Sequence, residues 1–406
     1  MKSCCVIGLG YIGLPTAIIL AKSGFFVNGV DIKEDLVRNL NKGQTHFKEP
    51  GLGKNLREVI KNKKFIADIN PKESDVFIVA VPTPINKNNK DIPQPNVKYV
   101  FEAAKLIGKY IRPGNIVIIE STSPVGTSEK VLDIIIEISG LSLKEIYLSY
   151  CPERVLPGNI LEELVKNNRI IGGINIDSAK KTKQIYETFC KGKIELTNVK
   201  TAELVKLTEN AYRDVNLAFA NELSLVCNKF GVNVFELIEH TNLHPRVNIL
   251  NPGCGVGGHC IAVDPWFIVN AAPEITPLIK TSREVNQNKT IWAINFIAKK
   301  VFELEKQISR KPIVGCFGLT FKADIEDIRE SPALQITTEL YKKGLDVMAF
   351  DPNLISLSSI KLSSLEDILE KADIYVILVG HKEFKKLVFN KKNVIDFCGI
   401  SNNSHI

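Results

Sequence analysis

The sequence of 406 residues has no apolar run close to the length of about 20 residues that a membrane-spanning helix needs. Only Lys2 separates the initial Met from a short strand-like segment, an arrangement typical of neither a signal peptide nor a transit peptide. We therefore expect a cytoplasmic protein that does not bind membranes. Hydrophobic residues make up 45% of the sequence and charged residues 24%, a composition that excludes a disordered or fibrous chain.

A metal site is not expected either, because the nine cysteines form no CxxC pair and the six histidines show no zinc-type spacing. Without an export signal most of these thiols should stay reduced. Those in apolar surroundings are predicted to be core residues, namely Cys4, Cys5, Cys190, Cys227 and Cys316. The net charge of +7 comes from scattered lysines without a basic-aromatic module, so the sequence favours small anionic ligands over nucleic acid.

Strand-like apolar runs alternate with helical stretches in the first part of the sequence and again near its end. The early runs are "SCCVIGLG", "FVNGVDI", "DVFIVAVPTP", "NIVIIESTSP" and "IYLSYCPERV". Such alternation predicts parallel sheets covered on both faces. Between the two parts, the apolar spacing predicts a long helix over 201–231 and a second from about 279 to 305.

We therefore predict an α/β protein with two Rossmann-like, doubly wound parallel-sheet domains, joined by a helical segment with a long central helix. The predicted boundaries separate a first α/β domain (1–200), a helical segment that carries a cysteine loop (201–305) and a second α/β domain (306–406).

The segment "GLGYIG" places Gly8, Gly10 and Gly13 directly after a strand and before a helix, with Tyr11 and Ile12 between them. In this context the first glycine allows a tight turn, the second lets a pyrophosphate approach, and the third lets helix and strand pack closely. Asp31 ends the next strand, where a carboxylate binds ribose hydroxyls and repels a 2′-phosphate, so NAD is favoured over NADP. The alternative is a tight turn without a cofactor.

Two hydroxyl residues, Thr83 in "VPTP" and Thr122 in "ESTSPVGT", follow other strands of the same predicted sheet. Ligands of open α/β folds bind at the carboxyl edge of the strands, so both are predicted ligand residues. The alternative role for each hydroxyl is to cap a helix.

The stretch "GCGVGGHCIAVDPWF" surrounds Cys260 with glycines and continues to Asp264. A thiolate beside a nicotinamide suggests aldehyde oxidation through a thiohemiacetal and a thioester, and the glycines would give the ligands room. Asp264 would then orient or activate water. The alternative is a buried loop cysteine beside a solvated carboxylate.

Lys206 and Asn210 lie four residues apart on the predicted long helix and therefore share one face, with Arg213 about one turn further. On a largely apolar helix, an ammonium and an amide can stabilise an alkoxide or a reacting carbonyl. The alternative is a solvated polar stripe.

Taken together, these motifs resemble those of the UDP-sugar 6-dehydrogenases of the UDP-glucose/GDP-mannose dehydrogenase family. The matching segments run in family order: "GLGYIGLP", "VPTP", "ESTSPVGT", "CPERVLPGN", "KLTENAYRDVN", "HPRVNILNPGCGVGGHCIAVDPWF" and "GLTFKADIEDIRESPA". The resemblance implies oxidation of the C6 alcohol of a UDP-sugar to a carboxylate with two NAD⁺, without release of the aldehyde. It also implies that the first domain (1–200) binds NAD, that the central domain (201–305) forms a homodimer through its long helix, and that the C-terminal domain (306–406) binds the UDP-sugar.

The resemblance further implies roles for individual residues. Cys260 would be the nucleophile and Lys206 would aid proton transfer and steady the oxyanion, while Thr122, Asn210 and Asp264 would manage water and hydrogen bonds. Arg329 matches a position that faces NAD. Lys206 and Asn210 also match positions that hold the nucleotide sugar, together with Arg154, Val155, Arg213, His244, Arg246, Gly257, Phe321 and Lys322.

Within the family the closest resemblance is to the branch that acts on UDP-N-acetyl-D-mannosamine, since Val263 and Pro157 replace residues typical of the UDP-glucose branch. The same chemistry on UDP-N-acetylglucosamine or UDP-glucose stays open, as does a catalytically silent nucleotide-sugar-binding module. The presence of Cys260, Lys206 and Asp264 together argues against the silent module, because binding alone needs no nucleophile.

One departure from the family pattern lies near the C-terminus. "VIDFCGI" places Cys398 where the family usually has a basic residue, so a uridine or phosphate contact is either missing or supplied by Lys391 or Lys392.

Overall fold

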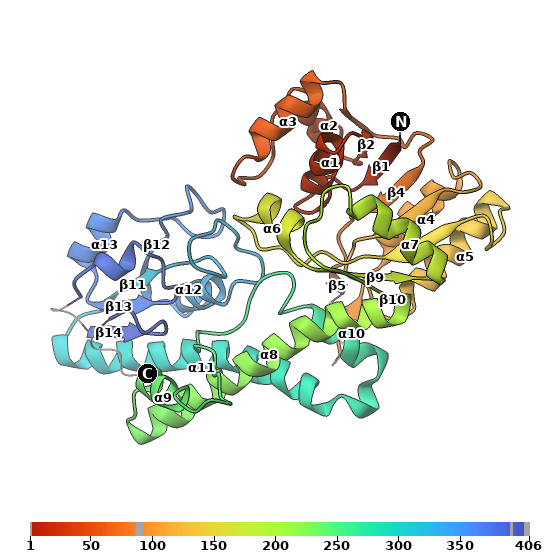
Figure 1. Cartoon of the computed structure of the whole chain (residues 1–406). Coiled ribbons are helices and arrows are strands. Elements are labelled where there is room, and N and C mark those ends of the chain that lie inside the picture. Colours follow the sequence, from red (N-terminus) through yellow and green to blue (C-terminus); the bar gives the residue numbers. More distant parts are fainter. Residues whose placement is uncertain (1, 87–91, 390–392, 402–406) are drawn as a thin grey trace. The chain divides into compact units, whose positions relative to one another are not determined.

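The computed structural model describes residues 2–86, 92–389 and 393–401. The chain divides into two compact units, the first formed by Met1–Thr208 with Trp266–Ala271 and the second by Glu209–Pro265 with Ala272–Ile406. Each unit is built on a sheet with helices on both faces (Figure 1). The predicted α/β fold with two Rossmann-like domains and a long central helix is therefore confirmed, whereas the division at residues 200 and 305 stays a prediction.

The sheet described in the first unit has eight strands in the order β10-β9-β8-β7-β4-β1-β2-β3. From β3 to β8 the neighbours are parallel, in the strand order of dinucleotide-binding folds. β9 pairs antiparallel with β8, so the edge formed by β9 and β10 departs from the predicted all-parallel sheet. The strands are β1 (Ser3–Ile7), β2 (Phe26–Val30), β3 (Phe65–Asp68), β4 (Val76–Val79), β7 (Ile116–Ile119), β8 (Tyr147–Tyr150), β9 (Arg169–Gly173) and β10 (Ile194–Asn198), and a separate hairpin pairs β5 (Ile85–Asn86) with β6 (Gln94–Pro95).

Side chains of successive strand residues point to opposite faces, so β1 contributes Cys4 to one core and Cys5 to the other. Both thiols are fully buried, as predicted, and burial raises their pKa. One face is covered by α1 (Gly13–Lys22), α2 (Glu34–Asn41), α3 (Leu52–Lys61), α6 (Ile160–Lys166) and α7 (Ile176–Tyr186). The other is covered by α4 (Lys98–Gly108), α5 (Thr127–Ser139) and the start of α8 (Val199–Phe230).

The sheet described in the second unit has four parallel strands in the order β12-β11-β13-β14. They are β11 (Ile313–Phe317), β12 (Asp346–Phe350), β13 (Ile374–Ile377) and β14 (Asn393–Asp396). One face packs on α11 (Pro277–Ile308) and α12 (Pro332–Lys342), and the other on α13 (Leu365–Lys371) and the turn η2 (Phe384–Lys386). The unit also contains α9 (Val234–Thr241), the first residues of α10 (Asp264–Ala271) and the turn η1 (Pro273–Ile275).

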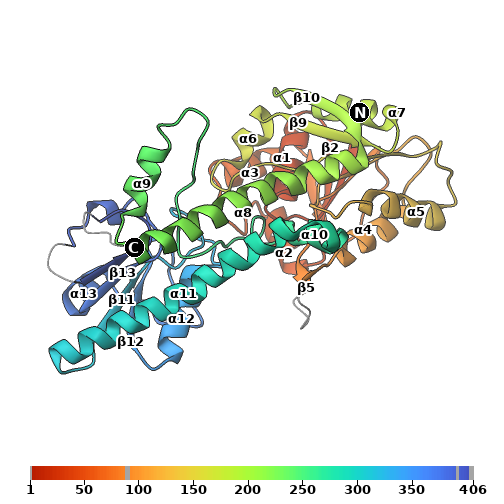
Figure 2. The ribbon, with the colours of Figure 1, turned by 90° about the horizontal axis from the view of Figure 1, so that it is seen from below.

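Polar side chains join α8 and α11, which lie side by side in the second unit (Figure 2). Arg283 donates to Asp214 at 2.5 Å, and Lys289 donates to Ser224 at 2.7 Å. These groups are almost completely buried, and burial raises the pKa of Asp214 and lowers that of Lys289 to about 7. The hydrogen bonds therefore offset only part of the cost of desolvation. Both helices confirm the predictions made from apolar spacing, and no helix in the described ranges is long and apolar enough to span a membrane.

Glu120, directly after β7 in the first unit, carries a buried carboxyl group. Tyr186 donates to its Oε1 at 2.6 Å and Thr16 of α1 donates to its Oε2 at 3.1 Å. Burial, together with the nearby carboxylate of Glu153, raises the pKa of Glu120 to about 8. The group therefore links α1, α7 and the end of β7 in a network that favours its neutral form.

We expect Glu120→Gln to become increasingly stabilising, relative to the parent, as the pH rises. Between the unfolded carboxyl pKa of about 4.5 and the folded value of about 8, the native state holds a proton that the unfolded state has lost, so the parent loses stability as the pH rises through this window. The amide does not ionise, and the difference should approach about 3 to 5 kcal/mol above pH 8. Urea unfolding at pH 5, 7 and 9 measures it, with exposed Glu137→Gln as the control. A difference that stays constant with pH would contradict the assignment.

Candidate active site

The glycine turn after β1 has the geometry that the sequence predicts for a dinucleotide-binding fold. Gly8 adopts φ +94°, a conformation that side chains rarely allow, and its N–H donates to Val30 of β2 at 2.8 Å. A Cβ on Gly13 would lie 1.8 Å from the carbonyl oxygen of Gly8. The roles predicted for the first and third glycines, a tight turn and close packing of α1, are thus confirmed.

The residues around this turn fit NAD. A Cβ on Gly10 would meet nothing within 4 Å, which leaves room for a phosphate, and Ile12 at the start of α1 provides no side-chain cap for the helix N–H groups. Asp31 is partly buried and accepts the amides of Leu9 and Lys33 at 3.1 Å, one on each oxygen. Each oxygen keeps a lone pair for a ribose hydroxyl. Tyr11 stacks on the ring of Phe47 beside this turn.

The predicted hydroxyl residues follow neighbouring strands at the same edge of the sheet. In the pairing register Val30, Ile7, Val79 and Ile119 lie side by side, so Thr83 after β4 and Thr122 after β7 both extend from the carboxyl edge that carries Gly8 and Asp31. Ser121 joins the two segments, since its hydroxyl donates to the carbonyl of Val81 at 2.8 Å. Both threonines are partly exposed and can reach a ligand.

Lys206 lies against the segment that carries the predicted substrate residues Arg154 and Val155. Its Nζ donates to the carbonyl oxygen of Glu153 at 2.8 Å, and the side chain is buried. The carboxylate of Glu153 in turn pairs with the buried guanidinium of Arg169. The first unit therefore brings the lysine and this segment together, as the resemblance implies.

In the second unit, three of the predicted catalytic residues gather at the start of α10. Cys260 is partly exposed, and its carbonyl oxygen accepts the amide of Asp264 at 2.8 Å. Asn210 donates from Nδ2 to the Asp264 carboxylate at 2.6 Å, and both side chains are buried. The polar residue on α8 and the acidic residue after the cysteine are thus hydrogen-bonded partners rather than solvated side chains.

The glycines before Cys260 make room mainly for the chain itself. A Cβ on Gly257 would lie 2.4 Å from the carbonyl oxygen of Glu330 and 2.9 Å from Cβ of Phe321, and one on Gly258 would lie 2.8 Å from the Phe321 ring. The sequence predicts that these glycines leave space for ligands, whereas the structure fills the space beside Gly257 and Gly258 with residues 321 and 330 of the same unit. Cys254 is buried against the carbonyl of Leu378, and burial raises the pKa of its thiol to about 12, so it is a core residue.

The other predicted residues of the second unit lie in three places. Arg213 is exposed on α8, and His244 and Arg246 are exposed on a loop that Asn242 closes by two hydrogen bonds to Ile249. The segment with Phe321 and Lys322 follows β11. Arg329, on the same connection to α12, pairs with Asp327 at 2.6 Å, and its carbonyl accepts the amide of Gly258.

Cys398 occupies the position where the family usually has a basic residue, but its buried thiol does not supply a positive charge. Its Sγ lies 3.9 Å from the carbonyl of Ile377, and burial raises the pKa of the thiol. Lys391 and Lys392 lie outside the described residues. Among the residues described, no group of three His, Cys, Asp or Glu is arranged to hold a metal ion.

Four buried polar residues around the site were not identified from the sequence. Glu203 anchors the start of α8 by accepting the amides of Gly126 and Ser128 at 2.7 and 2.8 Å. Glu120, Glu153 and His381 likewise have partners far away in the sequence. A local pattern gives no signal for such contacts; a carboxylate within an apolar run, as at Glu120, is the one available hint.

Comparisons with known proteins agree with this architecture. Three domain models of the UDP-glucose/GDP-mannose dehydrogenase family match, namely the NAD binding domain over 2–190, the central domain over 200–288 and the UDP binding domain over 315–403. A UDP-N-acetyl-D-mannosamine dehydrogenase of Campylobacter jejuni is 47% identical over 97% of this chain and 98% of its own. An NDP-N-acetyl-D-galactosaminuronic acid dehydrogenase of Ralstonia nicotianae is 45% identical over 94% and 91% of the two chains.

Among solved structures, that of UDP-D-ManNAc dehydrogenase from Pyrococcus horikoshii superposes with a TM-score of 0.90, at 38% identity and over 100% of this chain and 97% of the other. The domain models together match most of the sequence, and the solved structure covers all of it. The chain therefore belongs to the UDP-glucose/GDP-mannose dehydrogenase family and is an NAD-dependent dehydrogenase.

Proposed function

We propose that the protein oxidises the C6 hydroxyl of UDP-N-acetyl-D-mannosamine to the carboxylate in two NAD-dependent steps. The observation that carries this proposal is the partly exposed Cys260 at the start of α10, beside the buried Asn210–Asp264 pair. The names of the Campylobacter and Pyrococcus relatives support the choice of sugar.

The chemistry needs a group that retains the aldehyde between the two oxidations. NAD supplies the hydride acceptor in both. After the first oxidation the Cys260 thiolate forms a C–S bond to C6, and the aldehyde oxygen takes up a proton to give a thiohemiacetal. Loss of a second hydride and of the hydroxyl proton leaves a thioester. Water then breaks the C–S bond, so that one alcohol and one water yield one carboxylate, three protons and two transferred hydrides.

The remaining residues act on charge and water. Lys206 would hold the proton exchanged with the C6 oxygen and stabilise the oxyanion, since its Nζ is fixed beside the Glu153 carbonyl. Asp264, oriented by Asn210, would accept a proton from the attacking water, with Thr122 as a further hydrogen-bonding group. Arg154, Val155, Arg213, His244, Arg246, Gly257, Phe321 and Lys322 would hold the nucleotide sugar, and Gly8, Gly10, Tyr11, Ile12, Gly13, Asp31, Thr83, Thr122 and Arg329 would hold NAD.

A panel of nucleotide sugars tests the substrate. We expect NADH absorbance to rise with UDP-N-acetyl-D-mannosamine and much less with UDP-N-acetylglucosamine, UDP-N-acetylgalactosamine or UDP-glucose. The galactosamine compound is included because of the name of the Ralstonia relative. A preference for another sugar would show that UDP-N-acetyl-D-mannosamine is not the substrate. If none of the sugars produced NADH, a silent binding module would be favoured.

The nucleophile has its own test. We expect the parent to form two NADH per sugar consumed and Cys260→Ser to lose net acid formation, with kcat reduced by at least about 10³-fold, because a serine hydroxyl lacks a comparable anionic form at neutral pH. Binding of NAD and of UDP, measured by calorimetry, should be retained. Cys254→Ala is the matched control and should keep its turnover. One NADH per sugar with free aldehyde, or normal turnover in Cys260→Ser, would eliminate the thioester route.

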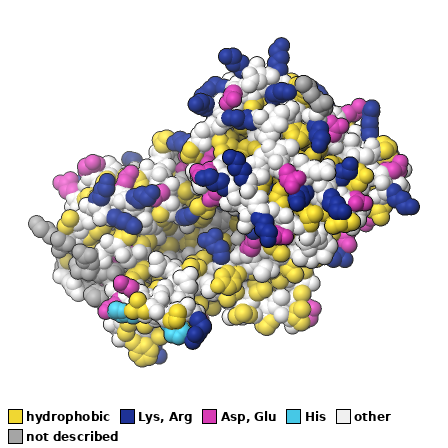
Figure 3. All heavy atoms as spheres, in the orientation of Figure 1, with side chains coloured by type: hydrophobic (Ala, Val, Ile, Leu, Met, Phe, Trp, Pro, Cys, Tyr) yellow, Lys and Arg dark blue, Asp and Glu magenta, His cyan; other side chains and the backbone are white. Residues whose placement is uncertain are grey.

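We further propose that the protein forms a homodimer through α8. Within the second unit, large apolar side chains of this helix are exposed at a spacing of seven, seven and four residues, at Tyr212, Phe219, Val226 and Phe230. This spacing places them on one face, as in helix–helix interfaces. On the face drawn in Figure 3, patches of exposed hydrophobic side chains are visible, and lysines and arginines are scattered among the other side chains.

Charge placed on this stripe should separate the subunits. We expect Phe219→Glu with Val226→Glu to elute as a monomer where the parent elutes as a dimer, because two carboxylates would have to be buried against the partner. Light scattering after gel filtration measures the mass. Ile355→Glu, at a position that is 92% exposed outside α8, is the control and should remain dimeric. A dimeric double variant would place the interface elsewhere.

A further inference from the structure

The two sheets repeat the same turn after their first strands. In the second unit Gly318 adopts φ +86° after β11 and donates to Phe350 of β12 at 2.8 Å, as Gly8 donates to Val30 in the first unit. Asp351 then follows β12 as Asp31 follows β2. Its Oδ2 accepts the amide of Leu319 at 2.7 Å and its Oδ1 that of Asn353 at 2.9 Å, matching the two amide bonds of Asp31.

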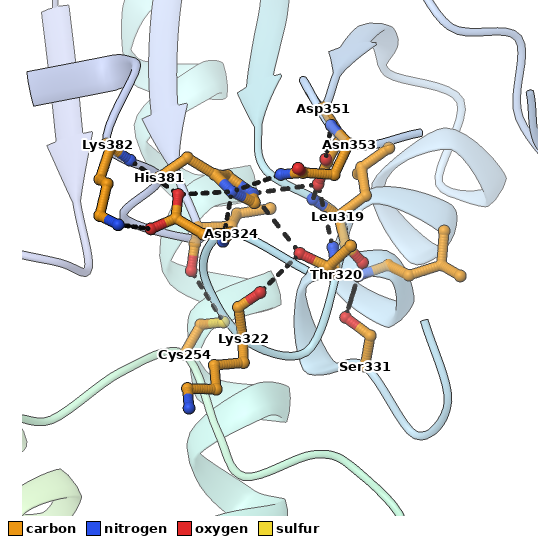
Figure 4. Close-up of polar contacts among 12 residues, drawn as sticks. Cys254, Leu319, Thr320, Lys322, Asp324, Ser331, Asp351, Asn353, His381 and Lys382 are labelled. Carbon is orange, nitrogen blue, oxygen red and sulfur yellow. Dashed lines mark hydrogen bonds and ion pairs between the residues drawn. The ribbon is translucent and has the colours of Figure 1, made fainter. Parts of the chain in front are cut away.

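The environment of the second carboxylate differs from that of the first. Asp351 is buried, and its Oδ2 also accepts the amide N–H of Thr320 at 3.1 Å. Nε2 of His381 lies 3.2 Å from the same oxygen (Figure 4). His381 is completely buried and stands four residues after Ile377, as Thr83 stands four residues after Val79 in the same register. The position that the partly exposed Thr83 takes in the first unit is therefore taken by a buried imidazole in the second.

The hydrogen bonds define the protonation of this imidazole. Nδ1 lies 3.0 Å from the amide nitrogen of Asp324, and because a backbone N–H can only donate, Nδ1 accepts. Asn353 Nδ2 also lies 3.0 Å from Nδ1, so it shares the single lone pair of this nitrogen with the Asp324 amide. The proton consequently sits on Nε2 and is donated to Asp351. His381 thus bridges a carboxylate on one side and a loop amide on the other.

That loop, Leu319–Asp324, carries Phe321 and Lys322. Asp324 adopts φ +63°, which is uncommon for a residue with a side chain, and its carboxylate accepts the amide of Lys382 at 3.1 Å. The hydroxyl of Thr320 donates to the carbonyl of Lys322 at 2.9 Å, and in Figure 4 the Lys322 side chain extends away from the His381 cluster. Phe321 packs on Gly257 and Gly258, three and two residues before Cys260.

We propose that His381 and Asp351 are positioning residues that hold the Leu319–Asp324 loop in the conformation that binds the nucleotide sugar. The inference rests on the proposed function, in which Phe321 and Lys322 contact that substrate. A neutral imidazole suits the task because it accepts from Asp324 and donates to Asp351 across the loop at the same time. Without the acceptor, the Asp324 amide loses its partner and the uncommon backbone conformation loses its support.

Loosening the loop should affect substrate binding more than turnover. If the loop adopts the binding conformation for only a fraction of the time, the apparent affinity for the substrate is reduced to that fraction of its full value. Bound substrate would hold the loop in this conformation, so kcat should stay nearly unchanged. A purely structural role would instead lower the melting temperature and the active fraction, and with it the apparent kcat, at an unchanged KM.

The two nitrogens can be tested separately. His381→Gln keeps a donor near the Nε2 position but loses the acceptor at Nδ1, whereas His381→Asn places an oxygen acceptor near Nδ1. We expect His381→Gln to raise KM for the UDP-sugar, and Kd for UDP in calorimetry, by about tenfold, with KM for NAD within about twofold of the parent. His381→Asn should stay within about threefold of the parent. His240→Asn, at an exposed position on α9, is the control and should change neither constant.

Thr320 provides a second pair of variants that keeps the imidazole, although its hydroxyl also lies 3.5 Å from Nε2 of His381. Thr320→Val removes the hydrogen bond to the Lys322 carbonyl and should raise the same KM and Kd about fivefold, while Thr320→Ser keeps the hydroxyl and should behave as the parent. Unchanged KM and Kd in both His381→Gln and Thr320→Val, or a lower kcat at constant KM, would overturn the positioning role. If the parent turns over no UDP-sugar, the proposed function fails, and UDP binding by the same variants still decides the inference.

Discussion

Each sheet depends on one carboxylate that holds the turn after its first strand. Asp31 and Asp351 follow the second strand of their sheets and accept the amide of the residue after a positive-φ glycine, at 3.1 and 2.7 Å. A carboxylate that accepts backbone N–H groups fixes the turn through charge-assisted bonds. In the first unit the turn opens towards a cofactor site, whereas in the second His381 and further amides surround the carboxylate. The same local interaction therefore holds both turns, in different surroundings in the two units.

The glycine loop is the second constraint, and it acts through volume. Backbone oxygen, proline and aromatic atoms approach positions 255, 257 and 258 so closely that no side chain fits. This approach couples the loop that leads to Cys260 with the segment that carries Phe321 and Lys322. The predicted nucleophile and the predicted substrate lysine thus lie on loops that pack directly against each other within the second unit.

Buried polar pairs recur along α8. Glu203 and Lys206 have partners in the first unit, while Asn210 and Asp214 have partners in the second. Burying each of these groups is costly unless its hydrogen bonds are made, so within each unit the bonds mainly offset the cost of desolvation. The same physics keeps Glu120 largely neutral, because desolvation exceeds the stabilisation that its hydroxyl donors provide.

The sequence by itself determined the elements whose signal is local. Apolar spacing predicted α8 and α11, and the strand context of Gly8, Gly10 and Gly13 predicted the turn that the structure contains. The antiparallel pairing of β9 with β8 was not predicted, because strand direction depends on partners elsewhere in the sequence. Nor were His381 and Glu120, whose bonds span 57 and 104 residues. Only the tertiary structure decided which polar groups are buried, because burial and hydrogen bonding are properties of distant segments brought together and not of the residues in any one motif.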